Sequence, residues 1–274
     1  MTVTQALAAA AALGVARFDA QLLLLHVLGR PAGDRGWLVA HDVDPLAAQH
    51  EAAFQALCRR RADGEPVAYL TGEKEFFGLA LQVDRRVLVP RPDTETIVEW
   101  ALDVLRERSK PRVIDLGTGS GAIALALRSA RPDAVLEAVD RSADALEVAA
   151  ANARRLGLEI TFRQASWLDG AGRYDLVVSN PPYVAAADPH LAALRHEPLQ
   201  ALAAGPDGLD DLRAIVASAA AHLLPGGWLL LEHGYDQADA VRALLRDAGF
   251  AEVASRRDLA GIERCSGGRR LELG

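Results

Sequence analysis

Four consecutive residues could hold a planar nitrogen group in place for reaction. The apolar segment 175–179 predicts a buried strand, and it ends abruptly in Asn180, Pro181, Pro182 and Tyr183. Prolines lack a backbone N–H and have a fixed φ, so the Pro181 carbonyl is free to point at a ligand. The Asn180 side-chain oxygen supplies a second acceptor, and the Tyr183 ring offers a flat face. The pattern predicts that two acceptors bind both hydrogens of one NH₂ group.

This arrangement suits transfer of a methyl group to an amide or amino nitrogen. Such a nitrogen is a weak nucleophile because its lone pair is delocalised, and hydrogen bonds from both N–H groups favour its pyramidal form. Alignment with the donor can contribute up to roughly 7–11 kcal/mol. Acceptors that strengthen as the nitrogen becomes positive stabilise the transition state. Water can take the proton afterwards, so no general base is required. The seven histidines have no metal-ligand spacing, and we expect no metal.

A glycine-rich loop predicts where a cofactor binds. Segment 113–122 passes from a strand pattern into a helix pattern, and its glycines allow positive φ and close approach of a ligand to the backbone. The loop consists of Gly117, Thr118, Gly119, Ser120 and Gly121. Together with Ala122 it also satisfies the relaxed dinucleotide fingerprint G-x-G-x-x-A, so a nicotinamide cofactor is an alternative.

Nearby acidic and aromatic residues favour S-adenosylmethionine over a dinucleotide. Asp115 ends the predicted first strand, where its carboxylate suits a cationic amino group and would repel a pyrophosphate. Asp140 ends the second strand, where a carboxylate can accept both ribose hydroxyls, although it could instead cap the helix that follows. After the third strand, Trp167 could flank adenine, pack in the core, or leave the adenine contact to Asp169. The sequence leaves these choices open.

Alternating strand and helix patterns must position these residues. Strands are predicted at 113–116, 134–139, 160–164, 176–179, 228–232 and 251–257, with 263–273 as a final edge strand. Helices are predicted at 122–129, 143–156, 212–224 and 237–248. This alternation predicts an α/β, Rossmann-like domain with a mostly parallel sheet and helices on both faces. We assign it to residues 93–274, with Asp93 capping a helix whose apolar face includes Ile97 and Trp100.

The chain before this domain has a different character. Residues 1–64 predict a small all-helical domain without nucleophile, metal cluster or phosphate loop, which favours a docking role. One helix starts near Val3, a second spans 18–28, and a third starts at Asp44 and Pro45. Residues 65–92 predict a β-hairpin and linker, with strands at 67–71 and 76–83.

Composition narrows the class of protein. The formal net charge of −7 argues weakly against non-specific nucleic-acid binding, which needs clustered positive charge. Two cysteines are too few for a disulfide framework, and no apolar run approaches the roughly 20 residues of a membrane span. We expect a cytoplasmic, reduced, soluble protein without membrane attachment.

Several sequence blocks resemble one family over nearly the whole chain. They are Glu65-Pro-Val-Ala-Tyr-Leu-Thr-Gly72, Phe76-Phe-Gly78, Val89-Pro-Arg-Pro-Asp-Thr-Glu95, Asp115-Leu-Gly-Thr-Gly-Ser-Gly121, Asn180-Pro-Pro-Tyr183 and His196-Glu-Pro198. In order and spacing they resemble the bacterial peptide chain release factor glutamine methyltransferases of the HemK type.

The resemblance implies both architecture and activity. It implies a seven-stranded class I methyltransferase domain, preceded by a helical domain and a hairpin, that uses S-adenosylmethionine. It implies as substrate the glutamine of the Gly-Gly-Gln motif in class I release factors, with no direct nucleic-acid substrate. Cofactor contacts would come from 117–121, Asp140, Trp167 and Asn180. Residues 180–183 would hold the glutamine, with Arg91, Glu95 and Glu197 near the pocket. Glu197 could equally be a cap or surface carboxylate.

Three alternatives follow from the same residues. A DNA adenine amino-methyltransferase would use the same Asn-Pro-Pro-Tyr logic, but it must extrude its base and hold the backbone with basic residues. The run 59–61 is the short basic segment available, and it fits a solvated helix face. A nicotinamide dehydrogenase would leave Asn180 and Asp115 unexplained. A non-catalytic binding module would bind without turnover.

Overall fold

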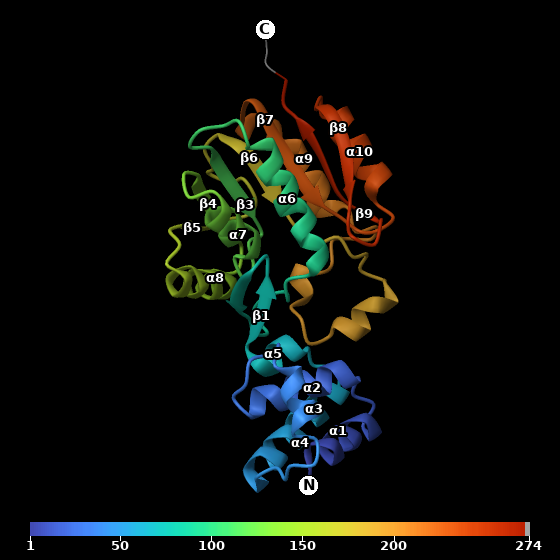
Figure 1. Ribbon diagram of the computed structural model, residues 1–274. Helices are drawn as coiled ribbons and strands as arrows, with labels where there is room; N and C mark the ends of the chain where they lie inside the picture. The colour runs from blue at the N-terminus through green and yellow to red at the C-terminus, as the bar shows by residue number, and fades with distance from the viewer. Residues whose placement is uncertain (272–274) are drawn as a thin grey trace. The chain divides into compact units, whose positions relative to one another are not determined.

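The computed structural model of the chain describes residues 1–271. They divide into two compact units, residues 1–73 and the part from Lys74 onward. The elements of both units are labelled in Figure 1. No helix within residues 1–271 has both the length and the apolar character needed to cross a membrane.

The first unit is entirely helical. Its elements are α1 (Val3–Ala12), α2 (Arg17–Val27), α3 (Arg35–Ala40), α4 (Ala48–Ala62) and α5 (Val67–Thr71). A Thr2–Gln5 capping box starts α1, in which each side chain bonds the other residue's backbone. Leu23, Leu24 and Phe54 lie in one buried cluster to which all five helices contribute.

Three expectations for this unit were wrong. The helix predicted to start at Asp44 and Pro45 begins at Ala48, because the Asp44 carbonyl accepts the Val3 N–H at 3.1 Å and Pro45 pairs with Thr2. Helix α3 was not predicted, since its six residues are too few to show a helical period. The strand predicted at 67–71 is helix α5.

Local boundaries and tertiary packing explain the change at α5. Pro66 occupies its N-cap position, and Gly72 ends it with a φ of +75°, which glycine adopts without strain. Ala68 and Leu70 are buried, and Leu70 belongs to the helical cluster. The β-branched residues at each end of the segment are therefore overridden by packing.

The second unit contains a seven-stranded mixed sheet, as predicted. Its strands are β3 (Arg112–Leu116), β4 (Val135–Asp140), β5 (Thr161–Gln164), β6 (Tyr174–Ser179), β7 (Leu223–Glu232), β8 (Ala251–Arg257) and β9 (Glu263–Arg269). The order is β5-β4-β3-β6-β7-β9-β8. Strands β3 to β7 are parallel to one another, and β9 is antiparallel to both β7 and β8. The predicted class I methyltransferase fold is confirmed.

Helices cover both faces of this sheet (Figure 1). They are α6 (Glu95–Val104), α7 (Ala122–Ala130), α8 (Ala143–Leu156), α9 (Asp210–His222) and α10 (Ala238–Asp247). Alternate residues of one strand enter opposite cores, as the strand period requires. Val113 packs with α6 and α7, whereas Ile114 packs with α9 and α10.

Three details differ from the predicted elements of this unit. The last strand is not at the edge, because β9 lies between β7 and β8, and residues 272 and 273 of that prediction lie outside the described residues. The hairpin strands are β1 (Glu73–Phe76) and β2 (Leu79–Gln82). Asp93 does not cap α6, since the 3₁₀ turn η1 (Pro92–Thr94) precedes it and Asp93 pairs with Arg264 at 3.3 Å.

Candidate active site

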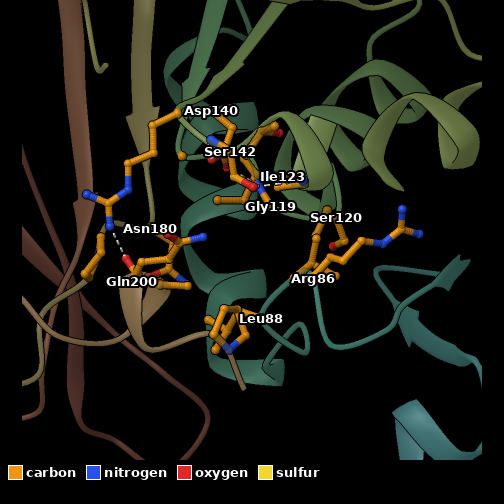
Figure 2. A pocket seen from close by; sticks show the side chains of 18 of the residues that line it. Arg86, Leu88, Gly119, Ser120, Ile123, Asp140, Ser142, Asn180 and Gln200 are labelled. Carbon is orange, nitrogen blue, oxygen red and sulfur yellow. Dashed lines mark hydrogen bonds between the residues drawn. The ribbon is translucent and has the colours of Figure 1, made fainter. Parts of the chain in front are cut away.

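The carboxyl ends of the parallel strands surround one cavity (Figure 2). Its empty space, the open mouth included, is about 960 Å³. The lining includes nine of the predicted site residues: Arg91, Gly117, Thr118, Gly119, Ser120, Asp140, Trp167, Asn180 and Pro182. The other five, Asp115, Gly121, Pro181, Tyr183 and Glu197, lie outside this lining. The strand ends therefore bring residues from four motifs to one place.

The glycine loop has two positions where a side chain would not fit. A Cβ on Gly117 would lie 3.3 Å from Cζ3 of Trp167, and a Cβ on Gly121 would lie 2.9 Å from Cδ1 of Leu125. Both glycines have positive φ, +67° and +85°, which L side chains rarely adopt. Gly117 thus lets the Trp167 ring approach the loop, and Gly121 lets α7 begin directly after it.

The Asp115 side chain is hydrogen-bonded to the glycine loop and to the first turn of α7. Its side chain is buried, and Oδ2 accepts the Thr118 hydroxyl at 2.6 Å and the Ala124 N–H at 3.2 Å. Its other oxygen, Oδ1, has no hydrogen-bond partner within residues 1–271. Burial raises the pKa of Asp115 to about 7, despite the two hydrogen bonds that lower it. A cation bound above the loop would therefore favour the ionised form.

We expect Asp115 to make stability depend on pH. Between about pH 4 and 7 the folded chain keeps this proton while the unfolded chain has lost it, so the free energy of unfolding falls as pH rises. The free energy of unfolding of the Asp115→Asn variant should fall less steeply with pH than that of wild type. The two slopes should differ by about 1.4 kcal/mol per pH unit in that window. Urea unfolding of the two proteins at several pH values measures the difference. Asp247→Asn, at an exposed position on α10, should keep the wild-type slope, and equal slopes for Asp115→Asn would contradict the assignment.

Asp140 lies on the cavity wall at the end of β4. Its Oδ2 accepts the Gly119 N–H at 3.0 Å and its Oδ1 accepts the Ser142 N–H at 2.9 Å. Ser142, rather than Asp140, caps α8 by accepting the Ala145 N–H. A carboxylate has about four lone-pair sites, so each oxygen can still accept a hydroxyl from the cavity.

The structure separates the two candidates for an adenine contact. Trp167 lines the cavity, and its indole interacts with the carboxylate of Asp211 by a side-chain hydrogen bond. Asp169 is exposed and outside the lining, and its carbonyl accepts Nη1 of Arg163 at 2.6 Å. The geometry therefore favours Trp167 as the flat wall for a base.

The acceptor pair lies at the end of β6. The Asn180 Nδ2 donates to Oγ1 of Thr94 at 3.2 Å, which leaves the Asn180 Oδ1 without a partner among the described residues. The Pro181 carbonyl is also unpartnered within residues 1–271. The Tyr183 hydroxyl donates to Oε1 of Glu232 at 3.4 Å, and burial raises the pKa of Tyr183 well above its usual range. Asn180 thus offers a free acceptor at the cavity, and a second free acceptor and a neutral ring follow it in the chain, outside the lining.

Backbone packing fixes Tyr183 further. Its carbonyl accepts Nε2 of Gln237 at 3.0 Å. A Cβ on Gly208 would lie only 2.3 Å from this carbonyl, so the chain can pass here only as glycine. Gln237 was not predicted as a site residue, because only the fold brings it from the start of α10 to Tyr183.

A flap of residues 184–205 borders the cavity. Val184 pairs with Ala203 at its base, and Pro198, Gln200 and Ala201 contribute to the cavity lining. Arg141 donates to the backbone carbonyl of Gln200 at 2.5 Å, and Gln200 is labelled in Figure 2. This hydrogen bond ties the flap to Arg141, the residue after Asp140.

Glu197 anchors the same flap. Its buried carboxylate pairs with Arg91 and accepts the Val89 N–H at 3.0 Å. Glu197 is therefore neither a helix cap nor a surface carboxylate. Glu95, expected near the pocket, instead accepts the Phe77 N–H at 3.0 Å and fixes the hairpin turn.

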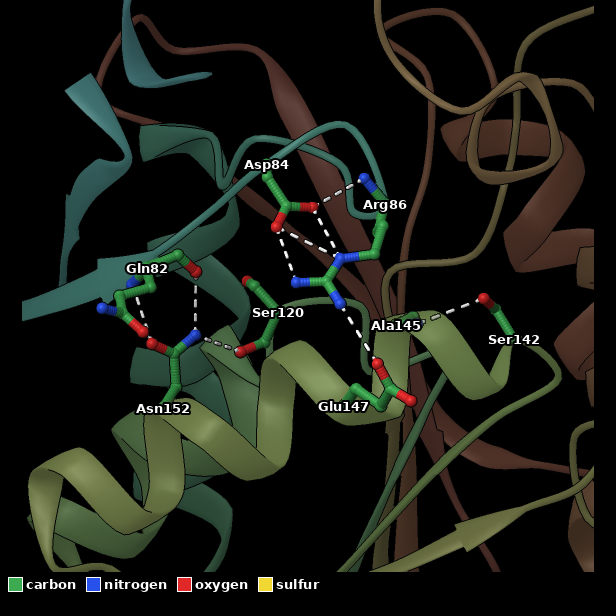
Figure 3. Close-up of polar contacts among 8 residues, drawn as sticks. All are labelled: Gln82, Asp84, Arg86, Ser120, Ser142, Ala145, Glu147 and Asn152. Atoms are coloured by element: carbon green, nitrogen blue, oxygen red, sulfur yellow. Dashed lines mark hydrogen bonds and ion pairs between the residues drawn. The ribbon is translucent and has the colours of Figure 1, made fainter. Parts of the chain in front are cut away.

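Asn152 connects the hairpin to the cofactor loop (Figure 3). This fully buried residue accepts the Gln82 N–H at 2.7 Å and donates to the Gln82 and Ser120 carbonyls at 2.9 and 3.0 Å. Nearby, Arg86 pairs with Asp84 and Glu147 while lining the cavity. Asn152 was not predicted, since a lone asparagine inside a helix pattern gives no signal of its partners.

Comparison with known proteins assigns the family. Residues 2–72 match the model of the PrmC N-terminal domain, and residues 97–205 match the Methyltransferase small domain. A release factor glutamine methyltransferase from Bordetella pertussis is 54% identical over 93% of this chain and 95% of its own length. One from Xylella fastidiosa strain Temecula1 is 52% identical over 96% of this chain and 97% of its own length. A Pyrococcus furiosus methyltransferase structure, 18% identical, shares the fold with a TM-score of 0.54 over 72% of this chain and 91% of that one. The chain belongs to the release factor glutamine methyltransferase family.

Proposed function

We propose that this protein transfers a methyl group from S-adenosylmethionine to the side-chain amide nitrogen of the glutamine in the Gly-Gly-Gln motif of class I peptide chain release factors. The free oxygen of Asn180, which lines the cavity, carries the proposal together with the unpartnered carbonyl of Pro181, the next residue in the chain. Two acceptors match the two hydrogens of one carboxamide. The curated relatives bear the same activity in their names over nearly the whole chain.

The residues around the cavity suit S-adenosylmethionine. Asp140 would accept the ribose hydroxyls, and Trp167 would flank the adenine. The Thr118 and Gly119 N–H groups already donate within the chain, so the loop offers chiefly open space, and no atom lies within 4 Å of a Cβ placed on Gly119. Asp115 beneath the loop favours a bound cation. When bound, the cofactor supplies an electrophilic methyl group on a sulfonium.

The chain's own residues would then orient the nucleophile. Asn180 and Pro181 accept the two N–H groups and turn the nitrogen lone pair toward the donor, and the Tyr183 ring packs on the planar amide. Positive charge develops on the nitrogen as it attacks, so these two acceptors bind the transition state more strongly than the ground state. The raised pKa of Tyr183 keeps its hydroxyl neutral at the site.

A labelled-methyl assay tests the proposal. Purified release factor is incubated with the protein and S-adenosylmethionine that carries a labelled methyl group, and a factor with the Gly-Gly-Gln glutamine changed to alanine is the control. Label on the intact factor and none on the control is the expected result. Label on both would place the reaction at another residue. No label on either, with cofactor binding established, would overturn the proposal, and labelling of duplex DNA would point to the amino-methyltransferase alternative.

The helical unit is proposed to dock the protein substrate. Removal of residues 1–73 is expected to raise the KM for release factor about tenfold or more, a loss typical of a removed interface, with little change in cofactor Kd. The deletion includes Leu70, so this residue of the helical cluster is not left behind without its packing partners. Steady-state kinetics and cofactor titration measure the two effects. Equal losses in both affinities would contradict a docking role.

This substrate sets the expected partners and location. Release factors act in translation termination, so we propose a cytoplasmic protein whose partner is a release factor rather than a nucleic acid or a membrane. The net charge of −7 supports this choice.

A further inference from the structure

The buried carboxyl group of Glu232 lies next to the acceptor pair. Ser179 and Leu231 are paired across the parallel strands β6 and β7, so the following residues, Asn180 and Glu232, leave neighbouring strand ends together. Glu232 is 1% exposed. A buried carboxyl group is costly unless hydrogen bonds satisfy it, so a fold that retains one at this place calls for an explanation.

Two neighbours join Glu232 to the substrate-binding motif. The Tyr183 hydroxyl donates to Oε1 at 3.4 Å. Oε2 makes no hydrogen bond of normal geometry within residues 1–271, yet the hydroxyl of Thr94 lies close enough to lower the pKa of the carboxyl group, which burial raises to about 7. Thr94 is itself 4% exposed and lines the cavity.

The direction of the hydrogen bonds in this cluster determines how the Asn180 carboxamide is oriented. Glu232, when ionised, accepts only, so the Thr94 hydroxyl directs its proton toward it. The Thr94 oxygen must then accept a proton from its other neighbour, the Asn180 Nδ2 at 3.2 Å. That choice fixes which end of the Asn180 carboxamide is the amine, and it leaves the oxygen for the substrate.

We propose that Glu232 is a positioning residue that, through Thr94, holds the Asn180 carboxamide with its oxygen directed to the substrate nitrogen. The inference rests on the proposed function, because the oriented oxygen acts on the amide hydrogens. A cluster of this kind works as a unit, since each hydrogen bond sets the direction of the next.

The first test is Glu232→Gln, which keeps the size of the side chain but introduces a donor. We expect kcat to fall about 10- to 100-fold, the loss that follows from a disrupted charge-assisted hydrogen bond. The KM for release factor and the Kd for S-adenosylmethionine should stay within about threefold of wild type, because the orientation matters in the transition state. Glu252→Gln, which removes an exposed carboxylate on β8, is the matched control and should leave kcat unchanged.

A pair of variants at Thr94 keeps the test decisive if Glu232→Gln fails to fold. Thr94→Val has the same shape without the hydroxyl and should lose kcat like Glu232→Gln, whereas Thr94→Ser should retain most of it. The double variant Thr94→Val/Glu232→Gln should be no worse than the poorer single variant, as expected for residues in one network.

The outcomes separate this inference from the proposed function. If wild type labels the release factor and Glu232→Gln keeps kcat within threefold, the positioning role is overturned. Equal loss in Thr94→Ser and Thr94→Val would also overturn it, since the hydroxyl would then be irrelevant. If wild type itself labels no release factor while binding S-adenosylmethionine, the proposed function fails, and with it the basis of the positioning role.

Discussion

An Asn180→Ala variant is expected to keep its fold and lose methyl transfer, with kcat reduced about 100- to 1000-fold, the loss typical of removing one preorganised group from a site where charge develops. The side-chain oxygen of Asn180 has no other partner among the described residues, and its amine is held by Thr94 at 3.2 Å. Alanine removes this acceptor and leaves only the Pro181 carbonyl for the two amide hydrogens.

Single-turnover methyl transfer to release factor measures this loss free of product release. Cofactor titration and thermal unfolding of the same sample report whether the fold survives, since Asn180 also lines the cavity and cofactor affinity should change far less than kcat. Gln164→Ala is a suitable control because it removes a carboxamide at the end of β5, exposed and outside the cavity lining. Near-normal turnover by Asn180→Ala would overturn the proposed mechanism.

The sheet and its helices could be predicted because their signals are local. Apolar runs such as 176–179 end in turn residues, and helices such as α8 carry an unmistakable cap and a terminal glycine, Gly157. The position of β9 in the sheet could not be predicted. Its insertion between β7 and β8 depends on pairing between strands that are separate in the sequence. At α5, the β-branched residues favoured a strand, while the flanking Pro66 and Gly72 favoured a short helix.

Some residues of the candidate site could likewise be predicted from the sequence, and others could not. Residues that follow a strand directly, such as Asp140 and Asn180, show in the sequence because their positions at strand ends carry meaning by themselves. Thr94 stands at a helix start and carries no such signal. Glu232 ends a predicted strand as Asp140 does, but only the parallel register of β6 and β7 shows that it lies beside the motif. Burial of Asp115 and Glu197 was equally hidden, since it depends on what packs over them.

Cofactor affinity should depend most on Asp140. We expect Asp140→Asn to raise the Kd for S-adenosylhomocysteine about 30- to 100-fold, since the carboxylate would lose charge-assisted hydrogen bonds to ribose hydroxyls and its hold on the Gly119 N–H at 3.0 Å. Isothermal titration measures the change. Asp144→Asn, an exposed change of the same charge in the first turn of α8, should stay within about twofold of wild type, because exposed charges contribute little.

A ligand variant separates the two roles of Asp140. If the carboxylate binds the ribose, wild type should prefer S-adenosylhomocysteine over its 2′-deoxy analogue by about tenfold, and Asp140→Asn should show little preference. If the carboxylate acts only by holding the loop through Gly119 and Ser142, both proteins should discriminate equally while the variant binds both ligands more weakly. The first outcome identifies a direct contact with the ribose. The second would make Asp140 a support of the loop and move ribose recognition to another part of the cavity wall.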